Sequence, residues 1–371
     1  MDGLQIVLGG PMTSGLIRTL NNVLGRGEAA VTVPPLDGAL RPNRKLDEAG
    51  SRLPLPGVDC LAVVSGELLA SARNKVYVLT EGRVWRSRSQ YEAEITCIAP
   101  VADGVLAVAL ASGEIILNGG SFAARRFRAP ENLRCITAIS ASGPDMFIAN
   151  GSATNSAEDW QIDLLQRNAS GSIWRIEPES GRITRLASGL GYPAGLTVDS
   201  TGLVYSEAWK HRLARISNAG NTQVLYADLP GYPGRLAPAT DGYWLSVFAP
   251  RSQLVEFVLR EPAYRARMVA EVPRPFWIAP KLRSGRSFYE PLQGGGVKHL
   301  GLLKPWAPAM SAGLCVKLDS AFQPLVSLHS RADGTAHGVT AAVEYDGRVF
   351  AAAHGDDVVV SLALEDLRDE E

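Results

Sequence analysis

The apolar positions of the chain fall in short runs that recur from about residue 55 onward. In the first group, residues 61–64, 68–70 and 75–79 are rich in Leu, Val and Ala, and a Ser65-Gly66 turn separates the first two runs. Apolar runs of this length, bounded by Gly, Asp and Ser, are typical of β-strands joined by tight turns. The pattern therefore predicts a domain built from many short strands.

Six such groups can be counted, at a spacing of about 36 to 56 residues with three or four strands in each. A sheet of this size cannot bury both of its faces alone, so neighbouring sheets must stack around an axis. The sequence predicts an all-β fold, a six-bladed β-propeller.

One segment, from about residue 251 to 308, interrupts the fifth group. It has helical patterns over 252–260 and 264–272, followed by a stretch rich in Pro, Gly and aromatic residues. We expect a partly helical insertion in the fifth blade. Long insertions of this kind often form a lid or binding loop, and the alternative is a packing excursion.

The N-terminal region has a different pattern. Residues 13–25 predict a short helix with one apolar face, which Thr13 or Ser14 can cap and Gly25 ends. Such a helix packs on its own domain or docks on a partner or membrane surface. We divide the chain into an N-terminal helix and extended segment (1–54) and a propeller (55–371).

Charge and composition narrow the class of protein. The 37 Lys and Arg residues nearly balance the 38 Asp and Glu residues, and they are interspersed, which argues against a nucleic-acid-binding surface. No apolar run approaches the length of a transmembrane helix, and the start of the chain lacks a signal-peptide pattern. We therefore expect a cytoplasmic location. The four cysteines show no CxxC spacing and predict buried apolar side chains.

Several segments resemble the strictosidine synthase-like proteins, in one register over about residues 34 to 365. The resemblance is carried by residues 34–46, 163–181, 189–196, 206–215, 227–233, 241–244 and 343–348. It implies a six-bladed propeller of the superfamily that also contains paraoxonases, gluconolactonases and adipocyte plasma membrane-associated proteins. It also implies a small-molecule ligand in the axial mouth of the propeller.

The resemblance implies four positions where the metal-dependent members hold calcium. Here they align with Asp59, the Cys135-Ile136 pair, Ala194 and Arg235. Only Asp59 supplies a carboxylate, a methyl group cannot ligate, and an arginine beside the axis repels a cation. We predict no metal site and no cofactor, with calcium binding as the alternative.

The strictosidine synthases use a glutamate in the last blade as acid and base, and this position aligns with His337. Histidine transfers protons near neutral pH, so His337 is our first catalytic candidate; the alternative is a histidine that lines a polar channel. Glu207 is the second candidate, and the alternative is that it fixes neighbouring loops by hydrogen bonds.

Four residues are candidates for binding the substrate. Arg235 offers a fixed fork of donors to an anion or carbonyl, or forms a structural ion pair. Asn150 aligns with a strand end at the mouth of the related proteins, Trp209 belongs to the matching segment 206–215, and Asp59 keeps the carboxylate of the first metal-ligand position.

The sequence thus predicts a strictosidine synthase-like small-molecule enzyme, a lyase, synthase, esterase or lactonase, that acts in the axial mouth without a metal ion. The first alternative is a non-catalytic propeller that binds a ligand or partner. The second is a calcium-dependent arylesterase or lactonase.

Overall fold

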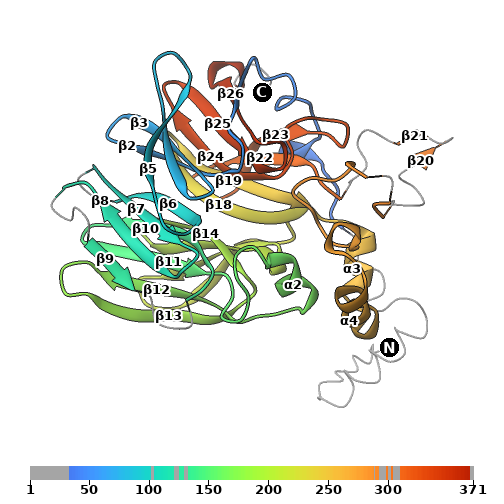
Figure 1. The fold of residues 1–371 in the computed structure, drawn as a ribbon, viewed down its shortest axis with the longest axis horizontal. Coiled ribbons are helices and arrows are strands. Elements are labelled where there is room, and N and C mark those ends of the chain that lie inside the picture. The colour runs from blue at the N-terminus through green and yellow to red at the C-terminus, as the bar shows by residue number, and fades with distance from the viewer. Residues whose placement is uncertain are drawn as a thin grey trace, which may run out of the picture.

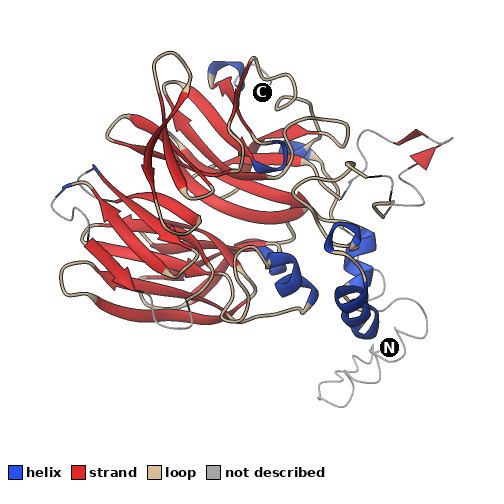
Figure 2. Ribbon diagram, in the orientation of Figure 1, coloured by secondary structure: helices blue, strands red, loops and turns tan. Residues whose placement is uncertain are grey.

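Six four-stranded antiparallel sheets surround a common axis, as the sequence predicts (Figure 1). The computed structural model describes residues 33–101, 104–120, 125–128, 133–287, 289–291, 298–299, 302–303 and 310–367. The predicted helix over 13–25 lies outside these residues. Strands dominate the described chain and helices are few (Figure 2). The fold is a six-bladed β-propeller.

The strands run outward from the axis in chain order. The first sheet contains β2 (Val58–Val64), β3 (Glu67–Ala72), β4 (Lys75–Leu79) and β5 (Trp85–Gln90). The second contains β6 (Ile95–Val101), β7 (Val105–Leu110), β8 (Glu114–Asn118) and β9 (Arg125–Arg128). The third contains β10 (Ile136–Ser142), β11 (Asp145–Asn150), β12 (Gly171–Glu177) and β13 (Arg182–Leu190).

The other three sheets repeat this arrangement. The fourth contains β14 (Pro193–Asp199), β15 (Gly202–Glu207), β16 (Arg212–Ser217) and β17 (Thr222–Tyr226). The fifth contains β18 (Gly231–Ala239), β19 (Gly242–Pro250), β22 (Gly313–Leu318) and β23 (Pro324–Ser330). The sixth contains β24 (Val339–Tyr345), β25 (Arg348–Ala353), β26 (Val358–Ala363) and, as its outermost strand, β1 (Ser51–Pro54).

Strand β1 closes the ring. It pairs antiparallel with β26, so the first and last strands of the propeller lie in one sheet. The repeat pattern shows only three strands in the last group, and the N-terminal segment supplies the fourth. The division of the chain at residue 54 stays a prediction.

Burial falls from the middle of each sheet to its outer edge. All six residues of β7 and of β15 are buried, because neighbouring sheets cover both of their faces. The outer strands β5 and β13 are mostly exposed or half-buried and carry several charged side chains. The core therefore lies between the sheets, where apolar side chains of adjacent blades pack.

The insertion leaves the fifth sheet between β19 and β22. It contains α3 (Gln253–Val258) and α4 (Pro262–Glu271), which confirms the partly helical insertion in the fifth blade. The short strands β20 (Lys298–His299) and β21 (Leu302–Leu303) form a separate hairpin. A further helix, α2 (Trp160–Leu165), lies in the long loop between β11 and β12 (Figure 1). Within the described ranges, no helix is long and apolar enough to span a membrane.

Candidate functional site

A cavity of about 600 Å³ lies where the first strands of the six sheets meet. The side nearest the third, fourth and fifth sheets carries three aromatic rings, Trp160, Tyr192 and Phe248, beside the polar residues Thr137, Ser156 and Glu158. The side nearest the first, second and sixth sheets is polar and contains, among others, Asp59, Arg73, Glu94, His354 and Asp357. The cavity can therefore hold a molecule with one apolar and one polar part.

A β-bulge occurs near the start of every innermost strand. In each sheet, the pairing with the second strand skips one residue, or two in the fifth sheet. The skipped residues are Asp59, Thr96, Thr137, Ala194, the Gly234-Arg235 pair and Thr340. All of them line the cavity, because a bulge turns its extra residue out of the regular pleat.

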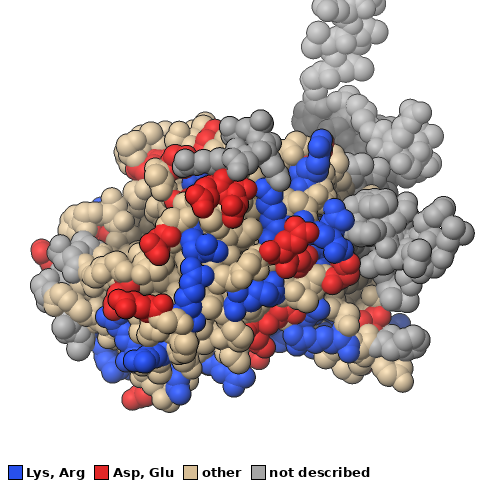
Figure 3. All heavy atoms as spheres, turned by 90° about the horizontal axis from the view of Figure 1, so that it is seen from above, with Lys and Arg blue, Asp and Glu red and all other residues tan. Residues whose placement is uncertain are grey.

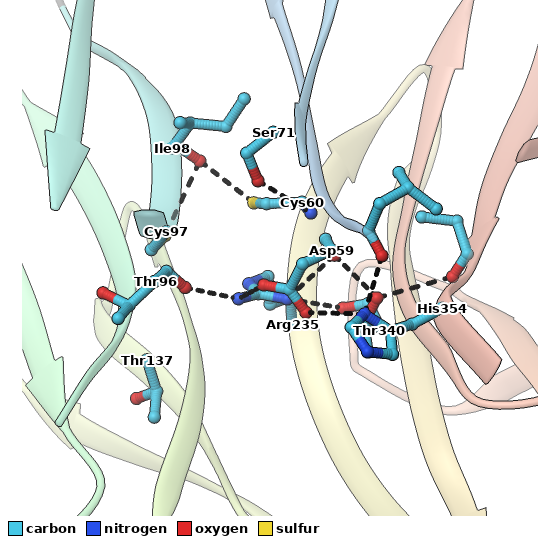
Figure 4. Close-up of polar contacts among 12 residues, drawn as sticks. Asp59, Cys60, Ser71, Thr96, Cys97, Ile98, Thr137, Arg235, Thr340 and His354 are labelled. Carbon is cyan, nitrogen blue, oxygen red and sulfur yellow. Dashed lines mark hydrogen bonds and ion pairs between the residues drawn. The ribbon is translucent and has the colours of Figure 1, made fainter. Parts of the chain in front are cut away.

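Arg235 extends from its bulge across the axis (Figure 4). Its Nη2 lies 2.6 Å from Oδ2 of Asp59 and donates a 2.7 Å hydrogen bond to the carbonyl of Thr96. Its Nη1 donates to the carbonyls of Asp59 and Thr340 at 3.1 and 3.2 Å. Burial alone would lower the pKa of the guanidinium, but the Asp59 carboxylate more than offsets this and raises that pKa. The arginine is a fixed positive charge at the bottom of the polar wall.

Asp59 also faces a histidine on the other side. Nδ1 of His354 lies 2.7 Å from the carbonyl oxygen of Val58 and 3.9 Å from Oδ1 of Asp59. A carbonyl only accepts hydrogen bonds, so Nδ1 must carry the proton. Nε2 is then the free, basic nitrogen, and it has no hydrogen-bond partner among the described residues. With 36% of its side chain exposed, His354 can exchange protons with a molecule in the cavity.

Two thiols lie next to the arginine. Cys60 and Cys97 directly follow the bulged residues of β2 and β6, and both are buried. The Cys97 hydrogen bond lowers the pKa of Cys60 to about 7, in spite of burial and with help from Arg235. The same interaction and burial raise the pKa of Cys97. The burial of both cysteines was predicted from the sequence, but the hydrogen bond between the two thiols was not.

The apolar wall is supported by a second layer of rings. Trp209 stacks on Tyr192 with 4.4 Å between the ring centroids, and Trp160 meets Phe248 edge-on at 5.4 Å. Nε1 of Trp209 donates a 2.7 Å hydrogen bond to Asp163, which holds the indole in place. Trp209, a predicted binding residue, thus lies behind the wall and positions Tyr192.

The insertion contributes to the same wall. Its helices pack against α2 through an apolar cluster that includes Leu165, Val258 and Met268. After this cluster the chain returns toward the axis, where Gln161 donates a 2.8 Å hydrogen bond to the carbonyl of Pro280. Leu282 then lines the cavity. Of the described part of the insertion, Leu282 thus lines the cavity, and the helices pack behind it against α2.

Three predicted site residues form structural hydrogen bonds away from the cavity lining. Glu207 is fully buried and accepts from the Gly191 amide, and Lys210 and Arg212 neutralise it at 2.7 and 2.6 Å. Burial would raise the pKa of Glu207, but these donors lower it. This arrangement matches the alternative that Glu207 fixes neighbouring loops.

His337 and Asn150 are buried in the same way. Nδ1 of His337 lies 2.8 Å from the Ser311 hydroxyl, and Nε2 lies 2.6 Å from the carbonyl of Arg331. Burial lowers the pKa of His337. Asn150 accepts from the amide of Cys135 and donates to the carbonyl of Ser152. The predicted roles of Glu207, His337 and Asn150 stay predictions, whereas Asp59 and Arg235 both line the cavity.

The axial residues do not fit a calcium ion. Arg235 places a positive charge among the axial oxygens, and Asp59 is already paired with it. The Ala194 side chain has no ligand atom, and the Thr137 hydroxyl donates to the carbonyl of Pro193 at 2.6 Å. Within the described ranges, no three His, Cys, Asp or Glu side chains are grouped to hold a metal ion.

His354 is the residue that the sequence analysis missed, since its segment reads as a turn. Equivalent positions of the fourth and sixth sheets contain a signal, however, because a short 3-10 helix directly follows the second strand in both. The second strand of the fourth sheet ends at Glu207, and a short 3-10 helix (Ala208–Lys210) follows it. In the sixth sheet β25 ends at Ala353, and the corresponding 3-10 helix (His354–Asp356) begins with the histidine.

No known protein family matches the chain, and neither does any curated protein. Solved structures do share the fold. A luciferin-regenerating enzyme aligns with a TM-score of 0.51 and 12% identity, over 84% of this chain and 93% of that one. A candidate gluconolactonase gives 0.48 and 10% over 86% and 91%, and virginiamycin B lyase from Staphylococcus aureus gives 0.47 and 12% over 85% and 98%. At 12% identity the luciferin-regenerating enzyme shows a shared propeller fold alone. The comparisons do not confirm the strictosidine synthase-like resemblance.

The visible charge on one face agrees with the balanced composition. In Figure 3, basic and acidic side chains lie among one another over the described surface. No broad basic patch of the kind that binds nucleic acid is seen on this face.

Proposed function

We propose that this protein is a small-molecule enzyme that works in the axial cavity without a metal ion and transfers protons through His354. The observation that carries the proposal is the hydrogen bond from Nδ1 of His354 to the Val58 carbonyl, with the Asp59 carboxylate 3.9 Å from the same nitrogen. This arrangement leaves Nε2 as a base and stabilises the positive charge that forms when it accepts a proton.

The cavity wall supports a substrate with an apolar, ring-sized part. That part would contact Trp160, Tyr192 and Phe248, while the reacting polar group would face His354. Arg73 lines the same cavity and forms no side-chain ion pair or hydrogen bond with another described residue. Its guanidinium is therefore available to a negative charge that develops on the substrate.

Three reaction types use these groups. In ester or lactone hydrolysis, His354 would take a proton from the attacking water as the water oxygen adds to the carbonyl carbon and the carbonyl π electrons move onto the carbonyl oxygen. When this intermediate collapses, the bond to the alcohol oxygen would break, and that oxygen would take the proton from His354. In condensation of an amine with an aldehyde, the reaction that the strictosidine synthase-like resemblance implies, it would remove and return protons. A lyase that breaks a carbon–heteroatom bond would need the same base.

The test is turnover of a substrate panel by the full chain in the presence of a chelator. The panel contains phenyl acetate, aliphatic and aromatic lactones, and amine–aldehyde pairs. Turnover that survives EDTA supports the proposal, and turnover that requires added calcium would replace it with a calcium-dependent hydrolase. The non-catalytic alternative draws on the structural use of Glu207 and His337, and no turnover across the panel would favour it.

A further inference from the structure

Arg235 satisfies backbone oxygens from several blades at once. Its two terminal nitrogens contact the carbonyls of Asp59, Thr96 and Thr340, which belong to β2, β6 and β24. Together with β18, which carries the arginine, four of the six innermost strands meet at one guanidinium (Figure 4). These carbonyls belong to bulged residues that the regular strand pairing skips. The carbonyls of Asp59 and Thr340 also lie 2.6 and 3.0 Å from the hydroxyls of Thr340 and Ser246, whereas the donor to the Thr96 carbonyl is Arg235.

The fifth sheet is built to deliver this side chain. Its bulge skips both Gly234 and Arg235, where the other sheets skip one residue. A Cβ on Gly234 would lie 2.6 Å from the Ser246 hydroxyl oxygen, so the close packing requires glycine. The hydroxyls of Ser206 and Ser246 donate to the carbonyls of Gly234 and Arg235 at 2.7 and 3.3 Å. The backbone on both sides of the arginine is thus held in place.

The oxygens around the guanidinium form a ligand set of their own. Three backbone carbonyls and one carboxylate converge on one point, and such hard oxygen donors suit a cation. Asp59 adds a negative charge at a half-buried position, which a positive partner stabilises. These four oxygens therefore favour a positive charge between them, and in this chain the Arg235 guanidinium supplies that charge.

We infer that the Arg235 guanidinium is a built-in cation, which fills an axial cation site and holds four blades together in place of a metal ion. Removing the side chain leaves the oxygen cluster in place and opens a site for a free guanidinium ion or a hard divalent cation. This inference concerns the architecture of the axis and does not rest on the proposed function.

The experiment compares thermal unfolding of the full chain and of Arg235→Ala in sodium chloride, guanidinium chloride and calcium chloride at equal ionic strength. We expect Arg235→Ala to lower Tm by about 5 to 10 °C, because the variant loses a half-buried ion pair and three hydrogen bonds to backbone carbonyls. Guanidinium at about 10 mM should restore at least half of the loss, because a ligand that binds only the folded state stabilises it. The unsubstituted chain should show no such rescue.

A double variant supplies the control. In Asp59→Asn/Arg235→Ala the carboxylate is absent, so the rescue by guanidinium should disappear. If Arg235→Ala does not fold, Arg235→Gln keeps amide donors, and isothermal titration should show calcium binding that the unsubstituted chain lacks. Equal Tm values in all three salts, together with no calcium binding by Arg235→Gln, would overturn the inference.

Discussion

Oδ1 of Asp59 lies 3.9 Å from Nδ1 of His354, although the two residues come from opposite ends of the propeller. The closure of the ring brings them together, since the first and sixth sheets are neighbours around the axis. Oδ2 of the same carboxylate contacts Arg235 at 2.6 Å. Asp59 therefore connects the fixed positive charge of the axis to His354, the only histidine among the described residues that line the cavity.

This relationship makes Asp59 a positioning residue with a measurable effect. Asp59→Asn removes the negative charge that stabilises protonated His354, so we expect kcat on any substrate of the panel to fall about tenfold or more. Asp357→Asn is the matched control, since Asp357 lines the same cavity and accepts from the Gly57 amide through Oδ1. An unchanged kcat per folded molecule in Asp59→Asn would contradict this role.

The apolar wall should determine substrate affinity. Trp160→Ala removes a ring that lines the cavity and packs on Phe248, so we expect KM for an aromatic substrate to rise about tenfold while kcat changes little. The measurement is steady-state kinetics on an aromatic and an aliphatic ester. Tyr264→Ala, on the exposed part of α4, serves as control. A rise in KM that is the same for both esters would argue against ring binding.

Glu207 should matter for stability and little for chemistry. Glu207→Gln leaves Lys210 and Arg212 without their buried partner, and we expect a loss of about 3 kcal/mol in the free energy of unfolding. The kcat per folded molecule should stay within about twofold of the unsubstituted chain. Denaturant unfolding measures the loss of stability. Steady-state kinetics, normalised to the concentration of folded protein, measures kcat. Lost turnover with unchanged stability would restore Glu207 as a catalytic candidate.

Glu344 gives a pH-dependent contribution to stability. Burial would raise its pKa, but the hydrogen bond from Lys317 and those from Thr240 and Trp244 lower it to about 2. An acid whose pKa is lower in the folded state contributes stability above its unfolded pKa and loses it as the pH falls. The contribution should therefore disappear between pH 4.5 and pH 2.

Glu344→Gln isolates this contribution. At pH 7 the variant should be less stable by about 2 kcal/mol, as expected for hydrogen bonds to a charged group. The difference from the unsubstituted chain should narrow as the pH is lowered below 4.5. Urea unfolding at pH 7 and pH 3.5 measures it, and Glu365→Gln, at an exposed position, should show no difference at either pH. A difference that stays constant with pH would refute the assignment to Glu344.

Much of the fold could be predicted because the apolar runs recur at blade spacing. The helices of the insertion also followed from their periodicity, to within a few residues. The closing strand β1 could not be predicted, since its partner β26 is some 300 residues away in sequence and a four-residue strand has no distinctive pattern. Helix α2 was missed for a similar reason, because six residues give less than two turns of helical periodicity.

The site was predicted only in part. Asp59 and Arg235 were predicted because the resemblance placed them at the starts of blades. Their contact with each other depends on the β-bulges, which the pattern of apolar and polar residues does not encode. Thr137 was missed at the second of these positions, where the alignment pointed to Cys135-Ile136. His337 and His354 could not be ranked from sequence, because their roles depend on whether both ring nitrogens have protein partners.

In the proposed function His354 is the proton-transfer group, and one comparison of two variants tests this role most directly. The rate constants of His354→Ala and His337→Asn should be measured in EDTA on the best substrate of the panel, with Tm values to normalise for folding. We predict that His354→Ala lowers kcat at least about 100-fold at unchanged Tm, while His337→Asn lowers Tm and retains kcat per folded molecule. Full turnover by His354→Ala, or loss of turnover by a folded His337→Asn, would contradict the account.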